Sequence, residues 1–281
     1  MAQEIRDSNS AIGKDQLLLG TERGDEIAVT SLLGGGADVN YQNSQRVTAL
    51  YVAVQTRNLR IARMLLEAGA RTDMQDTSGW CALHKATMME DADALRLLLK
   101  HGANVNQANN RGVTCLHLCV TKLGHHADVI AYILLQHGAD VNLRDGKGNS
   151  AFALSISLHK MAVFDVMCKF RPSVRRFDRN GLLPLHIAAL NNNASAIDKL
   201  VKMKAKPEAV TRDERGVTAL LLATQQQHVE AVAMLRKHGC SISTRDTNGA
   251  SPIEVALNMD DQLIIKTLLQ FATPRDVFQV S

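Results

Sequence analysis

The chain has 281 residues and is 46% hydrophobic but only 4% aromatic, so we expect one or two domains with an aliphatic core. Its formal net charge of +4 is too small to indicate a nucleic-acid or membrane-surface partner. No apolar run approaches the roughly 18 residues that a membrane-spanning helix needs. The composition therefore favours a globular protein with no nucleic-acid partner and no membrane insertion.

The first 14 residues are polar and lack the apolar stretch of a secretory signal, so we expect a polar N-terminal leader over residues 1–14. The chain has five cysteines, an odd number without the spacing of a disulfide framework. Because reduced thiols are typical of the cell interior, we expect an intracellular protein, cytoplasmic or nuclear.

Two short patterns recur along the chain. The first is GADVN at residues 36–40, with related sequences at 69–73, 102–106 and 138–142. The second begins at residues 48, 81, 114, 150, 183, 218 and 251, in steps of 33 to 36 residues. Counting back 33 residues from Thr48 adds a degenerate copy that starts at Asp15. We therefore predict about eight repeats over residues 15–272, followed by a C-terminal tail over 273–281.

The repeat that starts at Thr48 shows the elements expected in each copy. A first helix is predicted after Thr48, which is a favourable N-cap residue. A second helix follows the polar pair at residues 57–58 and ends before Gly69, where a left-handed residue commonly closes a helix. The predicted buried faces contain Ala49, Leu50 and Ala53 in the first helix and Ile61, Met64 and Leu65 in the second.

This pattern resembles the ankyrin repeat family, whose signature is T-P-L-H-x-A, and Leu183-Pro184-Leu185-His186 carries it most fully. The resemblance implies an all-α solenoid of helix-turn-helix units joined by β-hairpin loops. It also implies a monomeric, non-catalytic module without a cofactor, which binds a partner protein in the concave groove between hairpin tips and inner helices. Scaffold, adaptor and regulator roles all fit such a module.

Two groups of residues raise the question of catalysis or metal binding. Cys81 and His84 stand three residues apart, but His84 aligns with His117 and His186, and the family's histidine at this position hydrogen-bonds the backbone near the hairpin. Cys115 and Cys119, at i and i+4, have the spacing of zinc ligands, yet both occupy slots that face the core, where thiols pack as hydrophobes. No phosphate-binding loop or other catalytic motif occurs. We therefore expect neither an enzyme nor a metal site.

The repeats also depart from the consensus at several places. Extra residues enter at 121–126 and 206–211, and residues 171–176 replace the usual glycine-alanine. A local bend of the solenoid and a contact with a partner both fit these changes. The short basic stretches at 174–176, 202–206 and 236–237 are interpreted as a solvated face. Three asparagines lie in a pattern that resembles the one asparaginyl hydroxylases accept in ankyrin hairpins, namely Asn40, Asn106 and Asn142.

The candidate partner-binding surface comes from residues that the repeat does not require. Trp80, the only tryptophan, precedes the signature of its repeat at the position that Val47 and Val113 occupy in the neighbouring repeats. We predict an apolar anchor at Trp80 with a polar rim, because Trp and Arg are enriched among binding hot spots. The other predicted members are Val47, Val113, Met88 and Met89 in the apolar part and Arg46, Arg111, Gln45 and Ser78 around it.

Three alternatives stay open at this point. The indole of Trp80 could serve only the local packing of its hairpin. The chain could instead sense a small ligand or nucleotide, with Trp80 stacking on a base and Arg46, Lys85 or Arg111 holding phosphate. A third reading is a spacing element of a larger assembly.

Overall fold

The structure is a computed structural model that describes residues 15–122 and 124–270. The predicted leader at 1–14 and the predicted tail at 273–281 lie outside the described residues. Contacts divide the chain into two compact parts, residues 1–146 and 147–281, which we call the N-unit and the C-unit. Each is described by itself.

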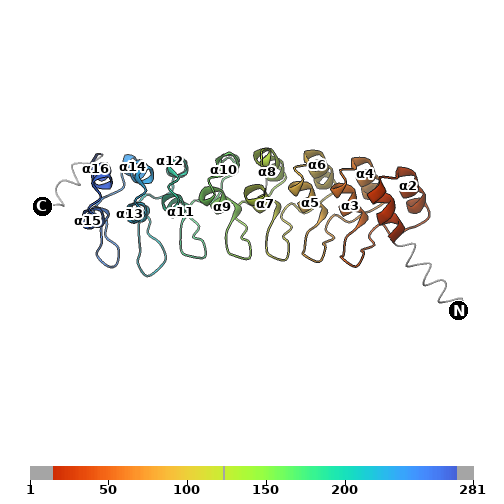
Figure 1. The fold of residues 1–281 in the computed structure, drawn as a ribbon, viewed down its shortest axis with the longest axis horizontal. Coiled ribbons are helices and arrows are strands. Elements are labelled where there is room, and N and C mark those ends of the chain that lie inside the picture. The colour runs from red at the N-terminus through yellow and green to blue at the C-terminus, as the bar shows by residue number, and fades with distance from the viewer. Residues whose placement is uncertain (1–14, 123, 271–281) are drawn as a thin grey trace. The chain divides into compact units, whose positions relative to one another are not determined.

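The N-unit consists of paired helices joined by long loops (Figure 1). Residues 15–23 are helical and precede α2 (Glu26–Gly34). The first helices of the next three repeats pack side by side, and so do the second helices. These helices are α3 (Ala49–Gln55), α4 (Leu59–Glu67), α5 (Ala82–Met88), α6 (Ala92–Lys100), α7 (Cys115–Thr121) and α8 (Ala127–Gln136).

The C-unit repeats the same arrangement in four helix pairs, and its loops project beyond the row of first helices (Figure 1). The helices are α9 (Ala151–Ser157), α10 (Met161–Cys168), α11 (Pro184–Leu190), α12 (Ala194–Lys202), α13 (Ala219–Gln225), α14 (Val229–Lys237), α15 (Pro252–Asn258) and α16 (Gln262–Gln270). In the part of the chain that the structure describes, no helix is both long and apolar enough to cross a membrane.

Several helices begin at a side-chain cap in a position that the sequence predicted. Thr48 Oγ1 accepts a hydrogen bond from the N–H of Tyr51 at 3.2 Å, and Ser150, Thr218 and Ser251 cap α9, α13 and α15 in the same way. Asn58 caps α4. A cap satisfies one of the N–H groups that the first turn of a helix leaves unpaired, so these hydroxyl and amide residues fix where their own helices begin.

The core lies between the helix pairs and is aliphatic, as the composition predicted. In the N-unit, Leu50, Leu83 and Leu116 hold the same signature position on α3, α5 and α7, and all three are buried. In the second helix of the Thr48 repeat, Ile61 and Leu65 are buried as expected, but Met64 is only partly buried. The C-unit adds an aromatic contact, because Phe152 and Phe164 stack with their ring centroids 5.2 Å apart.

Candidate functional site

The hairpins of the N-unit are held by one side chain each, five residues before the signature. Asn43 Oδ1 accepts hydrogen bonds from the N–H groups of Gln45 and Val47, both at 3.0 Å. Asp76 Oδ1 does the same for Ser78 at 2.8 Å and Trp80 at 2.9 Å. Asn109 completes the series in the next hairpin. These bonds close each loop into a defined turn, so the residues at its tip are fixed by the backbone.

Two glutamines then tie each hairpin to the next one. Gln42 Nε2 donates to the carbonyl oxygen of Arg46 at 2.6 Å and to that of Gln75, 33 residues along the chain, at 2.9 Å. Gln75 Nε2 donates to Gly79 O at 2.7 Å and to Ala108 O at 2.9 Å. Residues at the same position of consecutive hairpins are therefore kept in register.

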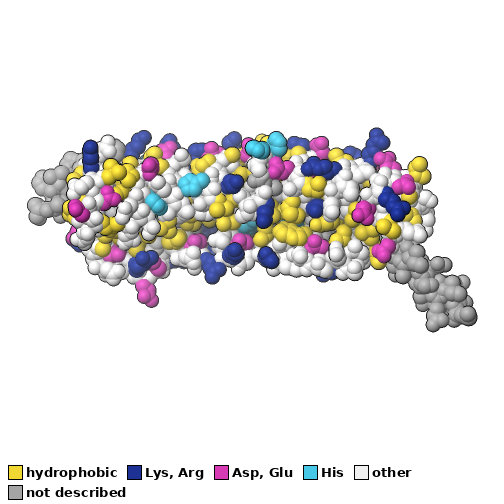
Figure 2. All heavy atoms as spheres, in the orientation of Figure 1, with side chains coloured by type: hydrophobic (Ala, Val, Ile, Leu, Met, Phe, Trp, Pro, Cys, Tyr) yellow, Lys and Arg dark blue, Asp and Glu magenta, His cyan; other side chains and the backbone are white. Residues whose placement is uncertain are grey.

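Trp80 is partly buried rather than free in solvent. Its ring meets the imidazole of His84 edge-on, with centroids 5.1 Å apart and planes at 73°. Val47 and Val113 occupy the equivalent position of the hairpins before and after it, and both are partly buried, as are Met88 and Met89 at the end of α5. Part of each of these five apolar side chains is open to solvent. We call them, with their rim, the Trp80 patch. Figure 2 shows hydrophobic side chains on the viewed face of the N-unit.

The rim of the Trp80 patch is exposed and polar. Gln45, Arg46, Ser78 and Arg111 are all exposed. Arg46 has a left-handed backbone, with φ of 59°, whereas the equivalent residue of the six later hairpins is glycine. A non-glycine residue in this conformation costs about 1–2 kcal/mol. The arginine is therefore held at a position where its backbone is strained.

Two features of this surface were not predicted from the sequence. Lys85 Nζ lies 5.6 Å from the centroid of the Tyr51 ring, a cation–π contact that joins α5 to α3. A hollow of about 590 Å³ adjoins the Trp80 patch and shares Gln45 and Val47 with it; the lining also includes Leu19, Glu22, Tyr41 and Val52. Its volume falls in the range of sites that hold a small ligand or a side chain of a partner. Neither feature has a motif in the sequence, because each depends on which side chains of separate repeats face one another.

Cys81 and His84 do come into contact, with 3.1 Å between Cys81 Sγ and His84 Nδ1. Both side chains are buried. Burial lowers the pKa of His84 to about 4 and raises the pKa of the Cys81 thiol. Since each group is held neutral, the pair supplies neither a thiolate nucleophile nor a charged imidazole at neutral pH.

The same histidine geometry recurs, as the repeat alignment implied. Thr114 Oγ1 lies 2.8 Å from His117 Nδ1, and Leu183 N–H donates to His186 Nδ1 at 3.1 Å. His186 Nε2 also lies 2.9 Å from Ala209 O, in the following hairpin. The recurring histidines thus support the start of the first helix through Nδ1, and His186 also contacts the next loop, which is the structural role predicted for this position.

The cysteines and the irregular segments also show packing roles. Cys115 and Cys119 are buried in α7, and burial raises the pKa of both thiols. Among the described residues, no three His, Cys, Asp or Glu side chains come close enough to form a metal site. The inserted loop between α7 and α8 is held by Glu90, which accepts from Gly124 N–H at 2.9 Å and from His126 N–H at 3.1 Å. The longer hairpin of the C-unit contains an antiparallel bridge between Val210 and Thr218.

Two asparagines named as hydroxylation candidates connect neighbouring repeats. Asn40 accepts from Arg71 N–H at 2.7 Å and donates to Gly69 O at 3.4 Å. Asn106 accepts from Asp140 N–H at 2.8 Å and donates to Gly138 O at 3.2 Å. The third, Asn142, bonds to Asp140. Because both the oxygen and the nitrogen of these amides form hydrogen bonds between repeats, the presence of asparagine at positions 40 and 106 has a structural explanation. Hydroxylation stays a prediction.

The paired helices, the recurring histidines and the hairpins agree with one family. The family model for ankyrin repeats (3 copies) matches residues 17–109, 68–145, 116–211 and 185–276. The chain belongs to the ankyrin repeat family. The predicted fold class, an all-α ankyrin array of about eight repeats, is confirmed.

A more local similarity links this ankyrin array to a plant protein. Over 84 residues it is 36% identical to the potassium channel AKT2/3 of Arabidopsis thaliana. The match covers 30% of this chain and 10% of the channel, so the chain spans a small part of the length of that relative. Ankyrin repeats are in general protein-interaction modules and are typically non-catalytic.

Proposed function

We propose that this ankyrin array is a non-catalytic adaptor or scaffold that binds a partner protein on the Trp80 patch of the N-unit. The observation that carries the proposal is the placement of Trp80 on a hairpin whose turn and register are fixed by Asp76 and Gln75. The indole adds nothing that the repeat needs, since valines fill the same position on either side. The buried, neutral Cys81–His84 pair supports a role without catalysis.

The rigidity of the surface supports binding with little loss of conformational entropy. Each side chain that is ordered only on binding costs about 0.5–1.5 kcal/mol, so a preformed surface retains more of its contact energy. Arg46 adds an exposed cation to the rim of this surface. We expect a monomer inside the cell, in the cytoplasm or the nucleus, with no nucleic-acid partner.

Replacing Trp80 by alanine tests this proposal. We expect partner affinity to fall by roughly 2 kcal/mol or more, as for a hot-spot residue. The free energy of unfolding should change by about 1 kcal/mol, because the side chain is only partly buried and loses one edge contact. Affinity is measured by calorimetry and stability by urea unfolding. Tyr132→Ala is the matched control, since Tyr132 is an exposed aromatic residue on α8 in the same unit.

A large loss of stability with unchanged affinity would show that the indole serves only local packing. The single tryptophan also separates this proposal from a nucleotide sensor. Titration with nucleotides should leave its fluorescence unchanged, whereas a sensor that stacks a base on Trp80 would quench it.

A further inference from the structure

The two parts of the chain differ in charge. The C-unit has 18 Lys and Arg residues against 12 Asp and Glu, a net charge of +6, while the N-unit has 14 against 16, a net charge of −2. Much of the excess in the C-unit lies at its hairpins. Figure 2 shows Lys and Arg side chains along the hairpin ends of this unit. The total of +4 conceals this asymmetry.

Four arginines on two consecutive hairpins form what we call the arginine edge, namely Arg175, Arg176, Arg179 and Arg212. All four are exposed. Within the described residues none of them forms an ion pair. Four guanidinium groups thus lack a carboxylate of their own. Such groups can bind carboxylates with paired hydrogen bonds.

Two of these arginines are held in place by their neighbours. The guanidinium carbon of Arg212 lies 4.4 Å from the centroid of the Phe177 ring. Arg179 Nη1 donates to Lys147 O at 2.7 Å, and its side chain lies against the backbone of Gly148. A guanidinium that is already oriented loses less entropy when a carboxylate binds it. The other donors of both groups stay available.

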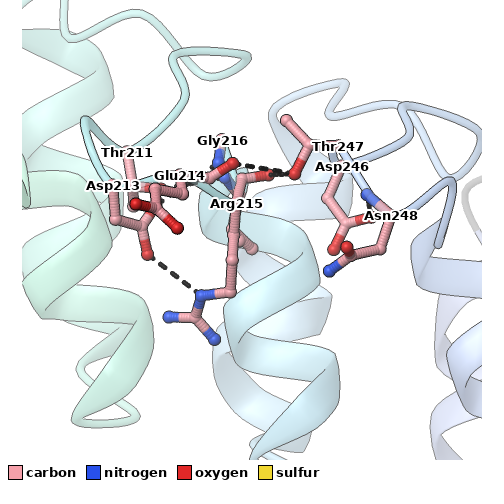
Figure 3. Close-up of polar contacts among 9 residues, drawn as sticks. Thr211, Asp213, Glu214, Arg215, Gly216, Asp246, Thr247 and Asn248 are labelled. Carbon is pink, nitrogen blue, oxygen red and sulfur yellow. Dashed lines mark hydrogen bonds and ion pairs between the residues drawn. The ribbon is translucent and has the colours of Figure 1, made fainter.

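Most acidic residues of these hairpins are engaged in other bonds, whereas the side chain of Glu214 is exposed. Asp178 Oδ1 accepts from the N–H groups of Asn180 and Leu182, both at 2.8 Å. Asp213 pairs with Arg215 at 3.0 Å, and the next hairpin joins the same loop through Thr247 (Figure 3). The hydrogen bond from Thr211 contributes most to a lowered pKa of Asp213. In contrast with the arginine edge, Arg215 and Arg245 each have a carboxylate partner.

We infer that the arginine edge binds an acidic peptide segment of a partner protein. This surface is separate from the Trp80 patch and does not depend on it. A short segment with a few Asp or Glu residues matches four guanidinium groups on two hairpins. A nucleic acid fits less well, because proteins that bind it through the backbone typically neutralise about 6–10 phosphates, and the N-unit carries net negative charge.

The test uses the full chain and a fluorescein-labelled decaglutamate peptide, followed by fluorescence anisotropy at 50 and 200 mM salt. We expect binding at low salt that weakens at high salt. The double variant Arg175→Gln/Arg176→Gln should weaken it roughly fivefold or more. Lys237→Gln/Lys266→Gln removes the same charge from exposed positions on α14 and α16 and should change the affinity less than twofold.

Three results would overturn the inference: no peptide binding by the wild-type chain, equal losses in both double variants, or tighter arginine-dependent binding of a ten-nucleotide uridine RNA than of the peptide. Thermal unfolding of each variant checks that the fold is intact. Trp80→Ala should bind decaglutamate like the wild type. Failure of this inference is therefore distinguishable from failure of the Trp80 patch.

Discussion

Arg46 shows how a single residue can carry a cost in stability. The six equivalent hairpin residues are glycines with positive φ, and a glycine there has no Cβ to strain. At Gly79 a Cβ would approach the Asn110 backbone nitrogen to 2.4 Å, so this hairpin leaves no room for a side chain there, whereas a Cβ at Gly249 would meet nothing within 4 Å. Arg46 is exposed at the rim of the Trp80 patch, where a cation can contact a partner.

Arg46→Gly should therefore change stability and binding in opposite directions. Relief of the left-handed strain should raise the free energy of unfolding by up to about 1 kcal/mol, less than the strain itself because glycine orders at a greater entropic cost. Partner affinity should fall as the rim cation is lost. Urea unfolding and calorimetry measure the two effects. The control is Arg111→Gln, at a residue without positive φ, which should weaken binding without the gain in stability. A destabilised Arg46→Gly protein would contradict the backbone strain assigned to Arg46.

His84 makes stability depend on pH. Its pKa is about 4 in the folded chain, where burial disfavours the charged ring, against about 6.5 when unfolded. Protonation therefore favours the unfolded state. The contribution of neutral His84 to the free energy of unfolding is complete above pH 6.5 and is lost as the pH falls toward 4. At pH 5 we expect a loss of roughly 2 kcal/mol relative to pH 7.

The measurement is urea unfolding at pH 7 and pH 5 for wild type and His84→Gln. The variant should lose less stability across this interval than the wild type does. His186, whose pKa burial also lowers, contributes in the same direction in both proteins, so the comparison isolates His84. Equal pH dependence of the two proteins would show that His84 is not held neutral by the fold.

At the scale of the elements, each hairpin is a turn closed by an acceptor side chain. Asn43, Asp76 and Asn109 share this role, so an amide and a carboxylate are interchangeable there. The turn at Asp76 holds the backbone N–H of Trp80. The stability of this element and the orientation of the proposed anchor are therefore linked.

Asp76→Ala should remove both turn bonds and lower the free energy of unfolding by about 2 kcal/mol, since it leaves two N–H groups without their acceptor. Partner affinity should fall with it, because Trp80 is no longer fixed. Asp76→Asn is the matched control and should retain both properties. Urea unfolding followed by Trp80 fluorescence reports on this hairpin directly. Equal effects of Ala and Asn would contradict the role given to the acceptor oxygen.

The helices were predictable because each is marked by local chemistry repeated many times. Thr48 as an N-cap, the turn at residues 57–58 and Gly69 after α4 all follow from residues near in sequence. The surface was less predictable. The contact between Trp80 and His84, the approach of Lys85 to Tyr51 and the Arg212–Phe177 stack depend on side-chain directions that no sequence pattern encodes.

At the scale of the whole molecule, two compact units carry two different surfaces. The N-unit, with net charge −2, presents a largely apolar patch with a polar rim, whereas the C-unit, with net charge +6, presents unpaired arginines. Apolar anchors contribute mainly to affinity, while exposed charges contribute mainly to association rate and selectivity. We expect the two surfaces to engage chemically distinct segments, one apolar and one acidic.

We propose the Trp80 patch as the partner-binding surface of the chain. The most direct measurement is quantitative affinity capture from cell extract with three immobilised proteins: wild type, Trp80→Ala and the control Tyr132→Ala. A defined set of proteins should be retained by wild type and Tyr132→Ala and lost with Trp80→Ala, while all three proteins unfold at similar urea concentrations. Retention of the same set by the folded Trp80→Ala protein would contradict the proposal.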